Sequence, residues 1–180
     1  MIDLNQYIDP VCLDKPGLEP LKGSAAFPHN VVVNTGNEPV GELDGFSVAI
    51  LGVPDDRSSA NTGAASAPDA IRKDLYSFSR LPGRLKIIDL GNFRPGASFD
   101  DTIAGLRDVL LQLLSKDIVP VIMGGTSALM PAIDRALSAG KQKWSLVSVD
   151  SRLDFTAEKR QPDSLNWMND LIYRSGSRLS

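Results

Sequence analysis

Histidine and cysteine are almost absent from this sequence, and their scarcity excludes several kinds of chemistry. The 180 residues include one histidine, His29, and one cysteine, Cys12. A lone cysteine cannot form an internal disulfide, and no second cysteine or histidine lies near Cys12 at the spacing of a metal site. We therefore interpret Cys12 as a small side chain packed in the interior. A single histidine also excludes most reactions that need paired imidazoles.

Long apolar runs and clusters of positive charge are missing as well. The formal net charge is −3, from 19 Lys and Arg against 22 Asp and Glu, and no basic cluster indicates binding to nucleic acid. The longest apolar runs, such as residues 118–123, are far shorter than the ~20 residues of a membrane-spanning helix, and the acidic N-terminus does not resemble a signal peptide. These absences predict a cytoplasmic protein. Neither a Walker A pattern nor a GxGxxG fingerprint indicates nucleotide binding.

The pattern of the chain divides it into an irregular arm and an α/β domain. Residues 1–44 contain five of the twelve prolines and no sustained periodicity, which predicts an arm that wraps the domain surface, with at most one strand, at 31–33. In residues 45–180, short apolar runs alternate with amphipathic segments, the pattern of βαβ units. Runs rich in Val, Ile and Leu predict parallel strands, buried on both faces, at 47–51, 86–90, 119–123 and 145–149.

Four helices are expected in the same domain. Ser66 with Asp69, and Ser98 with Asp101, have the spacing of a capping box. Ser127 is expected to cap a third helix that ends in a left-handed Gly140, and a fourth helix is expected at about residues 165–173. Apolar residues at helical spacing are expected to face the core: Ile71, Leu75 and Phe78 in the first helix, Ile103, Leu106, Leu110 and Leu113 in the second, and Leu165, Met168 and Leu171 in the fourth.

The loops that follow the predicted strands are where a ligand would bind, because ligands of open parallel sheets gather at the carboxyl ends of the strands. The third strand is followed by Gly124-Gly125-Thr126-Ser127-Ala128, and the fourth by Asp150-Ser151-Arg152-Leu153-Asp154. The N–H groups of two glycines before a helix could hold an anion. At a strand-to-helix turn, however, glycines more often serve a steric need.

Four motifs in this order resemble the ureohydrolase family, which includes arginase, agmatinase and formimidoylglutamase. They are Leu51-Gly52-Val53-Pro54 with the downstream Pro68-Asp69-Ala70-Ile71-Arg72, then Asp89-Leu90-Gly91, Pro120-Val121-Ile122-Met123-Gly124-Gly125, and Val149-Asp150. Each motif is weak alone, but their order and spacing are specific. The resemblance implies a three-layer α/β/α sandwich with a mainly parallel, arginase-like sheet that lacks the C-terminal strands. It also implies hydrolysis of guanidino or formimino C–N bonds at a two-manganese centre, where a bridging hydroxide attacks the planar carbon.

The metal motifs of the resemblance are degenerate in this sequence. The family reads Gly-Gly-Asp-His-Ser where this chain has Ser127 at the histidine position, and Asp-Ala-His-x-Asp where it has Arg152 at the second histidine. Only Asp150 and Asp154 retain ligand positions, because His29 lies in the arm and the family's third motif, Asp-x-Asp, would fall after the last residue. The guanidinium of Arg152 would supply the charge that a metal brings and would repel a cation. We interpret the set as a vestigial site, in which one carboxylate caps a turn and the other pairs with Arg152: Gly124, Gly125, Ser127, Asp150, Arg152 and Asp154.

The sequence therefore favours an inactive arginase-fold protein, with no catalytic residue and without manganese or another cofactor. Two other interpretations stay open. One is a formimidoylglutamase-like hydrolase of guanidino or formimino bonds that works without the usual metals, with Ser127, Asp150 and Asp154 near the site, although no base accompanies Ser127. The other is an interaction or assembly module. In the family, late strands lie between those at 119–123 and 145–149, so we expect these two strands to pair directly or a homo-oligomer or partner chain to cover the incomplete sheet.

Overall fold

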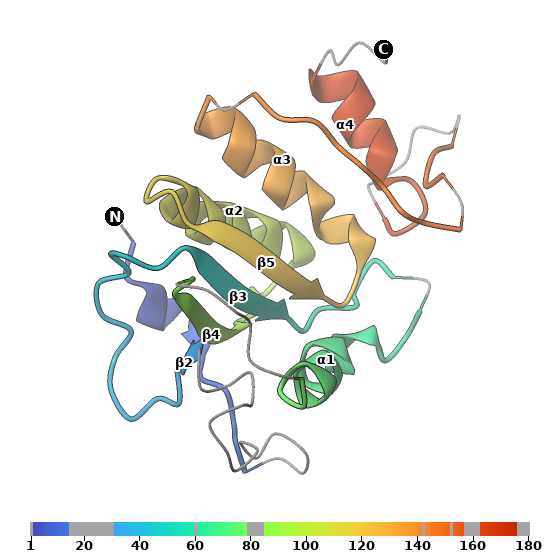
Figure 1. Cartoon of the computed structure of the whole chain (residues 1–180). Coiled ribbons are helices and arrows are strands. Elements are labelled where there is room, and N and C mark those ends of the chain that lie inside the picture. The colour runs from blue at the N-terminus through green and yellow to red at the C-terminus, as the bar shows by residue number, and fades with distance from the viewer. Residues whose placement is uncertain are drawn as a thin grey trace.

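The computed structural model contains a mostly parallel sheet and describes residues 2–14, 31–59, 61–78, 85–141, 143–151, 153–156 and 163–175. Its strands are β1 (Ile8–Asp9), β2 (Val31–Val33), β3 (Val48–Val53), β4 (Ile87–Phe93) and β5 (Val119–Gly124). They lie in the order β1, β4, β3, β5, and β2 pairs with the first half of β4 (Figure 1). β1 runs antiparallel to β4, whereas β2, β3, β4 and β5 pair in parallel. The strands predicted at 31–33, 47–51, 86–90 and 119–123 are confirmed, but the expected burial on both faces is wrong for β5, where Val119 and Val121 are exposed.

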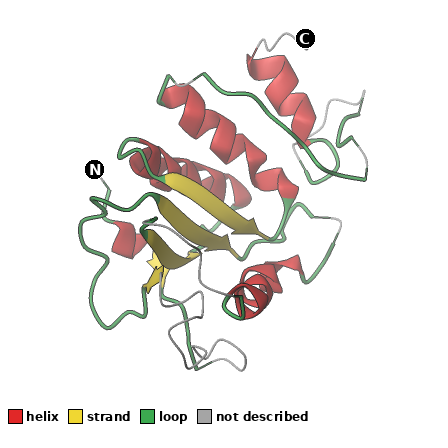
Figure 2. Ribbon diagram, in the orientation of Figure 1, coloured by secondary structure: helices red, strands yellow, loops and turns green. Residues whose placement is uncertain are grey.

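Helices cover both faces of this sheet (Figure 2). α2 (Phe99–Leu114) and α3 (Met130–Ala139) lie on one face, α1 (Ala67–Leu75) lies on the other, and α4 (Trp167–Ser175) packs on α3. Short 3-10 turns form at η1 (Leu4–Gln6), η3 (Ala64–Ser66) and η4 (Ser127–Leu129). The predicted three-layer α/β/α class is confirmed. Among the described helices, none has the length and apolar character needed to cross a membrane.

The two serines predicted to cap helices through a capping box differ in the structure. At α2, Ser98 Oγ accepts from the Asp101 N–H at 3.1 Å, and the Asp101 carboxylate accepts from the Ser98 N–H at 2.9 Å. At α1, Ser66 Oγ donates to the Gly63 carbonyl at 2.8 Å and caps nothing. Ser66 ends η3 with helical dihedrals of −80° and −10°, whereas a capping side chain needs an extended backbone. The prediction for Ser66 is therefore wrong.

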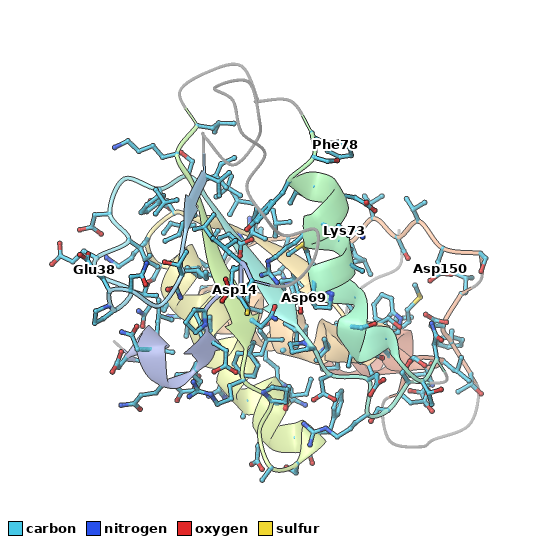
Figure 3. All side chains as sticks on the ribbon, turned by 90° about the horizontal axis from the view of Figure 1, so that it is seen from below. Asp14, Glu38, Asp69, Lys73, Phe78 and Asp150 are labelled. Atoms are coloured by element: carbon cyan, nitrogen blue, oxygen red, sulfur yellow. The ribbon has the colours of Figure 1, made fainter. Side chains whose placement is uncertain are left out.

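The predicted inward face of α1 is wrong for two of its three residues, although Leu75 packs against a small core cluster as expected. Ile71 is 44% exposed, and Phe78, just beyond the helix, is 60% exposed and lies at the outside of the molecule in Figure 3. The buried positions of α1 are Pro68 and Arg72, and Tyr76 at its end is also buried. These positions share the i, i+4 spacing that an apolar face would have, but the central one is a cation. Arg72 is buried because it meets a buried carboxylate of β4.

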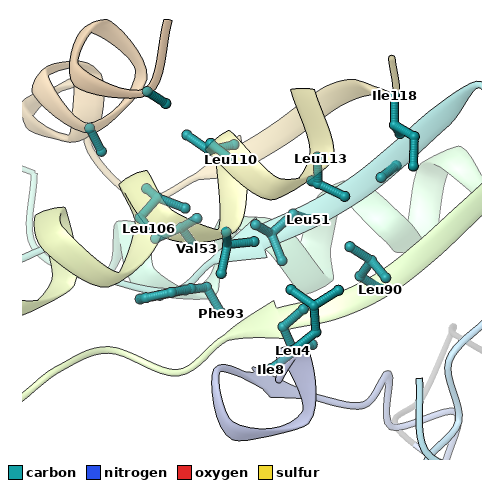
Figure 4. Packing of buried hydrophobic residues seen from close by; sticks show 14 of the residues in the cluster. Leu4, Ile8, Leu51, Val53, Leu90, Phe93, Leu106, Leu110, Leu113 and Ile118 are labelled. Carbon is teal, nitrogen blue, oxygen red and sulfur yellow. The ribbon is translucent and has the colours of Figure 1, made fainter. Parts of the chain in front are cut away.

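The main core lies between the sheet and α2, where the predicted residues of that helix are buried (Figure 4). Leu106 and Leu113 of α2 are inaccessible to solvent and pack with Leu51 of β3 and Leu90 of β4. Burial of such side chains contributes roughly 1.5–3 kcal/mol each. A separate small cluster lies under α4, formed by Trp167, Met168 and Leu171 with Met130 and Trp144 beside them. The fourth helix therefore has its own contacts with α3 and stands apart from the main core.

Parts of the N-terminal arm contribute to the sheet and to the core, although residues 35–39 lie exposed at the surface. Leu4 and Ile8 are buried in the main core, and β1 and β2 both join β4. Arg94 holds this segment by donating to the Asp9 carboxylate at 2.6 Å. The expectation that the arm only wraps the surface is thus wrong. The arm's boundary at residue 44 remains a prediction.

Three further expectations differ from the structure. Cys12 is exposed rather than packed, because Val11, not Cys12, turns into the core. Gly140 keeps a right-handed φ of −73° because its N–H still bonds the Ala136 carbonyl, and Lys141 adopts the left-handed φ of 54° instead. The strand predicted at 145–149 does not form: Val147 is 86% and Val149 98% exposed, and no described strand pairs with them. An apolar run becomes a strand only when a neighbour accepts its backbone hydrogen bonds.

Candidate functional site

A cavity of about 480 Å³ opens at the carboxyl end of β5. The loop from Gly124 to Ser127, which leads from β5 into η4, lines this cavity together with residues 146–150, which belong to no helix or strand. Met130 and Ile133 of α3 and Trp167 of α4 complete its mainly apolar wall. This volume lies in the range of small-molecule sites, and the position is where an open parallel sheet places them.

Of the two glycines at this turn, Gly125 serves a steric need. The Gly125 N–H donates to the Val53 carbonyl at 3.1 Å, so it does not point into the cavity to hold an anion. A Cβ atom on Gly125 would lie 2.4 Å from the Asp55 carbonyl oxygen, closer than any side chain is tolerated. At Gly124 the nearest atom would lie at 3.6 Å, an ordinary contact. Gly125 therefore lets the β5 turn approach the loop after β3.

The hydroxyl groups beside the glycines bond the backbone. Thr126 has an extended backbone, and its side chain accepts from the Ala128 N–H at 3.2 Å. Thr126, rather than Ser127, therefore caps the turn that precedes α3. Ser127 Oγ donates to the Ser164 carbonyl at 3.3 Å, a bond that links this loop to the segment before α4. Among the described residues, no basic side chain hydrogen-bonds to either hydroxyl, so neither is activated as a nucleophile by those contacts.

The two retained carboxylates occupy different environments. Asp150 is exposed, lines the cavity and lies at the periphery in Figure 3. Asp154 is only 3% exposed, and its carboxylate accepts from the Trp167 Nε1–H at 2.7 Å. The Asp154 carbonyl also accepts from the Met168 N–H, so this residue anchors the start of α4. Arg152, and with it the predicted ion pair, lies outside the described residues. The structure thus gathers Gly124, Gly125, Ser127 and Asp150 around one cavity, while Asp154 is not among the residues that line it.

The donor set at this cavity does not fit the two-manganese centre that the resemblance implies. Manganese takes carboxylate, imidazole and water ligands, and a two-metal site needs several of them at once. Asp150 is the only carboxylate among the described lining residues, and no imidazole accompanies it. Within the described ranges, no three His, Cys, Asp or Glu residues come together as a candidate metal site.

A buried polar network at the carboxyl half of β4 was missed by sequence reasoning. The Arg72 guanidinium donates to both carboxylate oxygens of Asp89 at 2.9 Å, and Tyr76 Oη donates to the same carboxylate at 2.8 Å. Arg72 also donates to the Gly91 carbonyl at 2.7 Å and to Asn92 Oδ1 at 2.6 Å. A signal existed in the sequence, since Asp89 interrupts an apolar strand and a buried charge requires a partner.

The electrostatics of this network follow from burial and from the Asp89 charge. Burial, together with Asp89, raises the pKa of the Tyr76 hydroxyl far above its ordinary value. Burial alone would lower the pKa of Arg72, but the hydrogen bonds and charge of Asp89 outweigh it and raise that pKa. The network also shapes the backbone: the Gly91 N–H bonds Asp89 at 3.0 Å, and Gly91 takes a φ of +102° where the β3–β4 register shifts. Every group is satisfied within the protein, so we assign this network a structural role.

A second polar cluster ties the loop after β3 to α2. Asp55 is buried and accepts from Arg57 Nη2 at 2.6 Å, while the same nitrogen donates to Thr102 Oγ1 at 2.9 Å. Burial acts to raise the pKa of Asp55, but the hydrogen bonds and charge of Arg57 prevail and lower it. This cluster holds the loop against which Gly125 packs.

A three-layer α/β/α domain with a cleft at the carboxyl end of its parallel strands defines a broad class, and the comparisons with known proteins identify the family within it. The profile described as the arginase family matches residues 46–168. The chain therefore belongs to the arginase family. Formimidoylglutamase of Salmonella paratyphi C is 32% identical over 83 residues, which are 43% of this chain and 26% of that protein.

Solved structures of arginase-family proteins superpose on this chain, which supports the same fold. Formimidoylglutamase from Bacillus subtilis superposes with a TM-score of 0.64 at 22% identity, over 74% of this chain and 46% of that one. Trypanosoma cruzi formiminoglutamase with Mn²⁺ gives 0.65 at 21% identity, over 73% and 49% of the two chains. A putative agmatinase from Clostridium difficile gives 0.61 at 17% identity, over 71% and 50%. The chain thus matches about half the length of each of these solved structures and about a quarter of the length of the Salmonella formimidoylglutamase.

Proposed function

We propose that this chain is an arginase-fold pseudoenzyme, which neither binds two manganese ions nor hydrolyses guanidino or formimino C–N bonds. The observation that carries the proposal is the position of Asp154. Its carboxylate is buried against Trp167 instead of lining the cavity, so Asp150 is the one carboxylate that the described cavity wall offers. A cation held by one exposed carboxylate and neutral hydroxyls would bind weakly, because selective sites need several ligands in fixed geometry. We also propose that the protein functions in the cytoplasm, as its sparse cysteine suggests.

A second candidate function is formimidoylglutamase-like hydrolysis. It is favoured by the 32% identity to a Salmonella formimidoylglutamase and by the mostly apolar cavity of substrate-like volume. Under this alternative, Ser127 and Asp150 would lie near the substrate, whereas Asp154, which was also expected there, is buried against Trp167. The Ser127 hydroxyl donates its hydrogen bond to the Ser164 carbonyl. A backbone carbonyl cannot act as a general base in the way that a histidine does.

The test combines metal titration with activity. Calorimetric titration of the purified chain with manganese should show no tight site, and assays for urea release from guanidino substrates and for formimino hydrolysis should stay at the buffer rate. The double variant Ser127→His/Arg152→His should raise manganese affinity without restoring turnover, since the cavity still has too few carboxylates. Two exposed substitutions, Ser115→His/Lys143→His, control for added histidine. Two tight sites per wild-type chain, or turnover that a chelator abolishes, would refute the proposal.

A further inference from the structure

A second cavity, of about 390 Å³, lies beside β2, on the side of the sheet away from β5 (Figure 1). Its described lining residues fall within 32–46, with Ile88 of β4 added. None of them lines the cavity at the end of β5. A cavity of this volume has the size of a small-molecule site.

The floor of this cavity is apolar because α2 covers β4 but does not extend over β2. The register pairs Val32 with Ile88, so both side chains leave the sheet on the face where α2 lies. Ile88 is 6% exposed there, whereas Val32 is 56% exposed. Val40 and Phe46, which pack against the main core, also line the cavity. An aliphatic group placed over Val32 would therefore gain the free energy of apolar burial.

The loop that forms the wall is held in place by hydrogen bonds. Asn34 Nδ2 donates to the Leu90 carbonyl at 2.8 Å, and Asn34 Oδ1 accepts from the Gly36 N–H at 3.1 Å. Further along the loop, the Val40 N–H donates to Asn5 Oδ1 at 2.8 Å. The cavity is thus formed before any ligand arrives, as is usual for small-molecule sites.

Two carboxylates line this cavity without a counter-charge. Glu38 and Glu42 are exposed, and neither has a hydrogen-bond or ion-pair partner among the described residues. Figure 3 shows Glu38 at the periphery of the molecule. The described lining residues include no lysine, arginine or histidine. Asp44, only two residues after Glu42, is paired with Lys116, so the chain neutralises this neighbour and leaves the two glutamates unpaired.

We propose that this cavity binds a small organic cation, an alkylammonium whose aliphatic body covers Val32 and whose charged end is held by Glu38 and Glu42. The apolar floor and the negative charge at the cavity are each complementary to one part of such a molecule. The inference does not rest on the proposed loss of activity, because the two cavities share no described residue.

Other classes of ligand match this cavity less well. An anion would be repelled by Glu38 and Glu42, and a neutral molecule would leave both carboxylates without a counter-charge. A metal ion requires several ligands in fixed geometry, whereas this cavity offers two exposed carboxylates above an apolar floor. Charge complementarity and the apolar floor together favour the alkylammonium.

Titration of the full chain with hexylamine, an ammonium ion at neutral pH, tests the proposal by amide NMR spectra. We expect saturable binding, with shifts confined to residues 32–46 and the surroundings of Ile88. 1-Hexanol has the same body without the charge and should bind about threefold to tenfold more weakly, while hexanoate should not bind. From butylamine to hexylamine, each added methylene should tighten binding about threefold to fourfold. A lack of saturation, shifts elsewhere in the chain, or equal affinity for hexylamine and 1-hexanol would overturn the proposal.

Removal of the two charges at the cavity is the first variant test. Glu38→Gln/Glu42→Gln should weaken hexylamine binding about threefold to tenfold and leave 1-hexanol binding unchanged. Asp74→Asn/Asp100→Asn is the matched control, because it removes two exposed charges that do not line the cavity. Higher salt should weaken the binding of hexylamine more than that of 1-hexanol. An equal loss in both double variants would be a general effect of net charge and would contradict the site.

The apolar floor is tested separately. Val32→Thr should weaken hexylamine binding, whereas Val119→Thr, at a β5 valine with nearly the same exposure, should not. N-acetyl-lysine methylamide is the probe for a lysine side chain of a partner protein, and it should bind more weakly than hexylamine. Tighter binding of this probe would assign the cavity to a partner's lysine and overturn the proposal. The manganese titration reads a different cavity, so either proposal can fail alone.

Discussion

A buried carboxylate stabilises a fold only when other groups satisfy its charge, and Asp89 meets that condition. It accepts hydrogen bonds from Arg72, Tyr76 and the Gly91 N–H, and its side chain is inaccessible to solvent. The close fit extends to β3, where a Cβ atom on Gly52 would lie 2.0 Å from Asn92 Oδ1. Glycine at position 52 thus has a packing reason that is independent of any ligand.

We predict that Arg72→Met lowers the free energy of unfolding by about 3–5 kcal/mol, because it leaves the Asp89 charge buried without its cation. Tyr76→Phe removes one hydrogen bond and should cost about 1–3 kcal/mol. Urea denaturation followed by circular dichroism measures both values. Arg107→Met, which breaks the partly exposed pair with Asp108, should cost less than about 1 kcal/mol. Equal losses for Arg72→Met and Arg107→Met would contradict this account.

At the scale of single elements, two helix starts with the same serine-to-aspartate spacing behave differently. α2 begins with a complete capping box, whereas the first turn of α1 continues from η3 without a side-chain cap. In α1, Asp69 instead accepts from Asn92 Nδ2 at 3.2 Å, and so contacts the buried network of β4. The preceding backbone conformation decides which role the serine takes.

We predict that Ser98→Ala lowers the free energy of unfolding by about 1 kcal/mol, since it removes the acceptor for the Asp101 N–H. Ser66→Ala should cost clearly less, because no α1 N–H loses its partner. Thermal and urea unfolding of the two variants under one condition provide the comparison. If Ser66→Ala proved as costly as Ser98→Ala, Ser66 would be a true cap.

At the scale of the whole molecule, polar bridges connect segments that are distant in the chain. Arg57 lies between Asp55, the Ala97 carbonyl and Thr102, and so holds the loop after β3 to the start of α2. The lowered pKa of Asp55 means that its ionised form favours the folded state. Its contribution is complete above the ordinary aspartate pKa of about 3.9 and is lost as the pH falls through the lowered folded value.

We therefore predict that Asp55→Asn destabilises the protein near neutral pH and that its disadvantage narrows at about pH 3 and below. In the wild type, the stabilisation by the ionised Asp55 carboxylate disappears over that pH range. The asparagine side chain of the variant does not titrate, so its contribution to stability stays the same. Urea midpoints across an acid series measure the slope of stability with pH. Asp108→Asn, at a partly exposed surface pair, controls for removal of one negative charge. A constant difference between wild type and Asp55→Asn at every pH would exclude this linkage.

Local pattern was sufficient for much of the fold. Apolar runs identified β3, β4 and β5, and regular helical spacing with a complete cap identified α2, because these elements satisfy their own backbone and bury a face that the sequence itself displays. The order of the loop motifs also indicated the arginase family, which the match over residues 46–168 shows. The sequence also predicted that Gly124, Gly125, Ser127 and Asp150 lie at one site, because they stand at the end of β5 and at the end of segment 145–149, and all four line the cavity.

Only the tertiary structure decided the features that depend on a distant partner. Arg72 is buried because its guanidinium pairs with Asp89 of β4. A hydrophobic periodicity analysis would instead place an arginine on the exposed face of the helix. Asp154 leaves the cavity because Trp167 of α4 offers it a hydrogen-bond donor. Segment 145–149 has the composition of a strand but no described neighbour to complete its hydrogen bonds. Composition and spacing report what one segment prefers, whereas a buried charge and a sheet edge are satisfied by atoms from elsewhere in the fold.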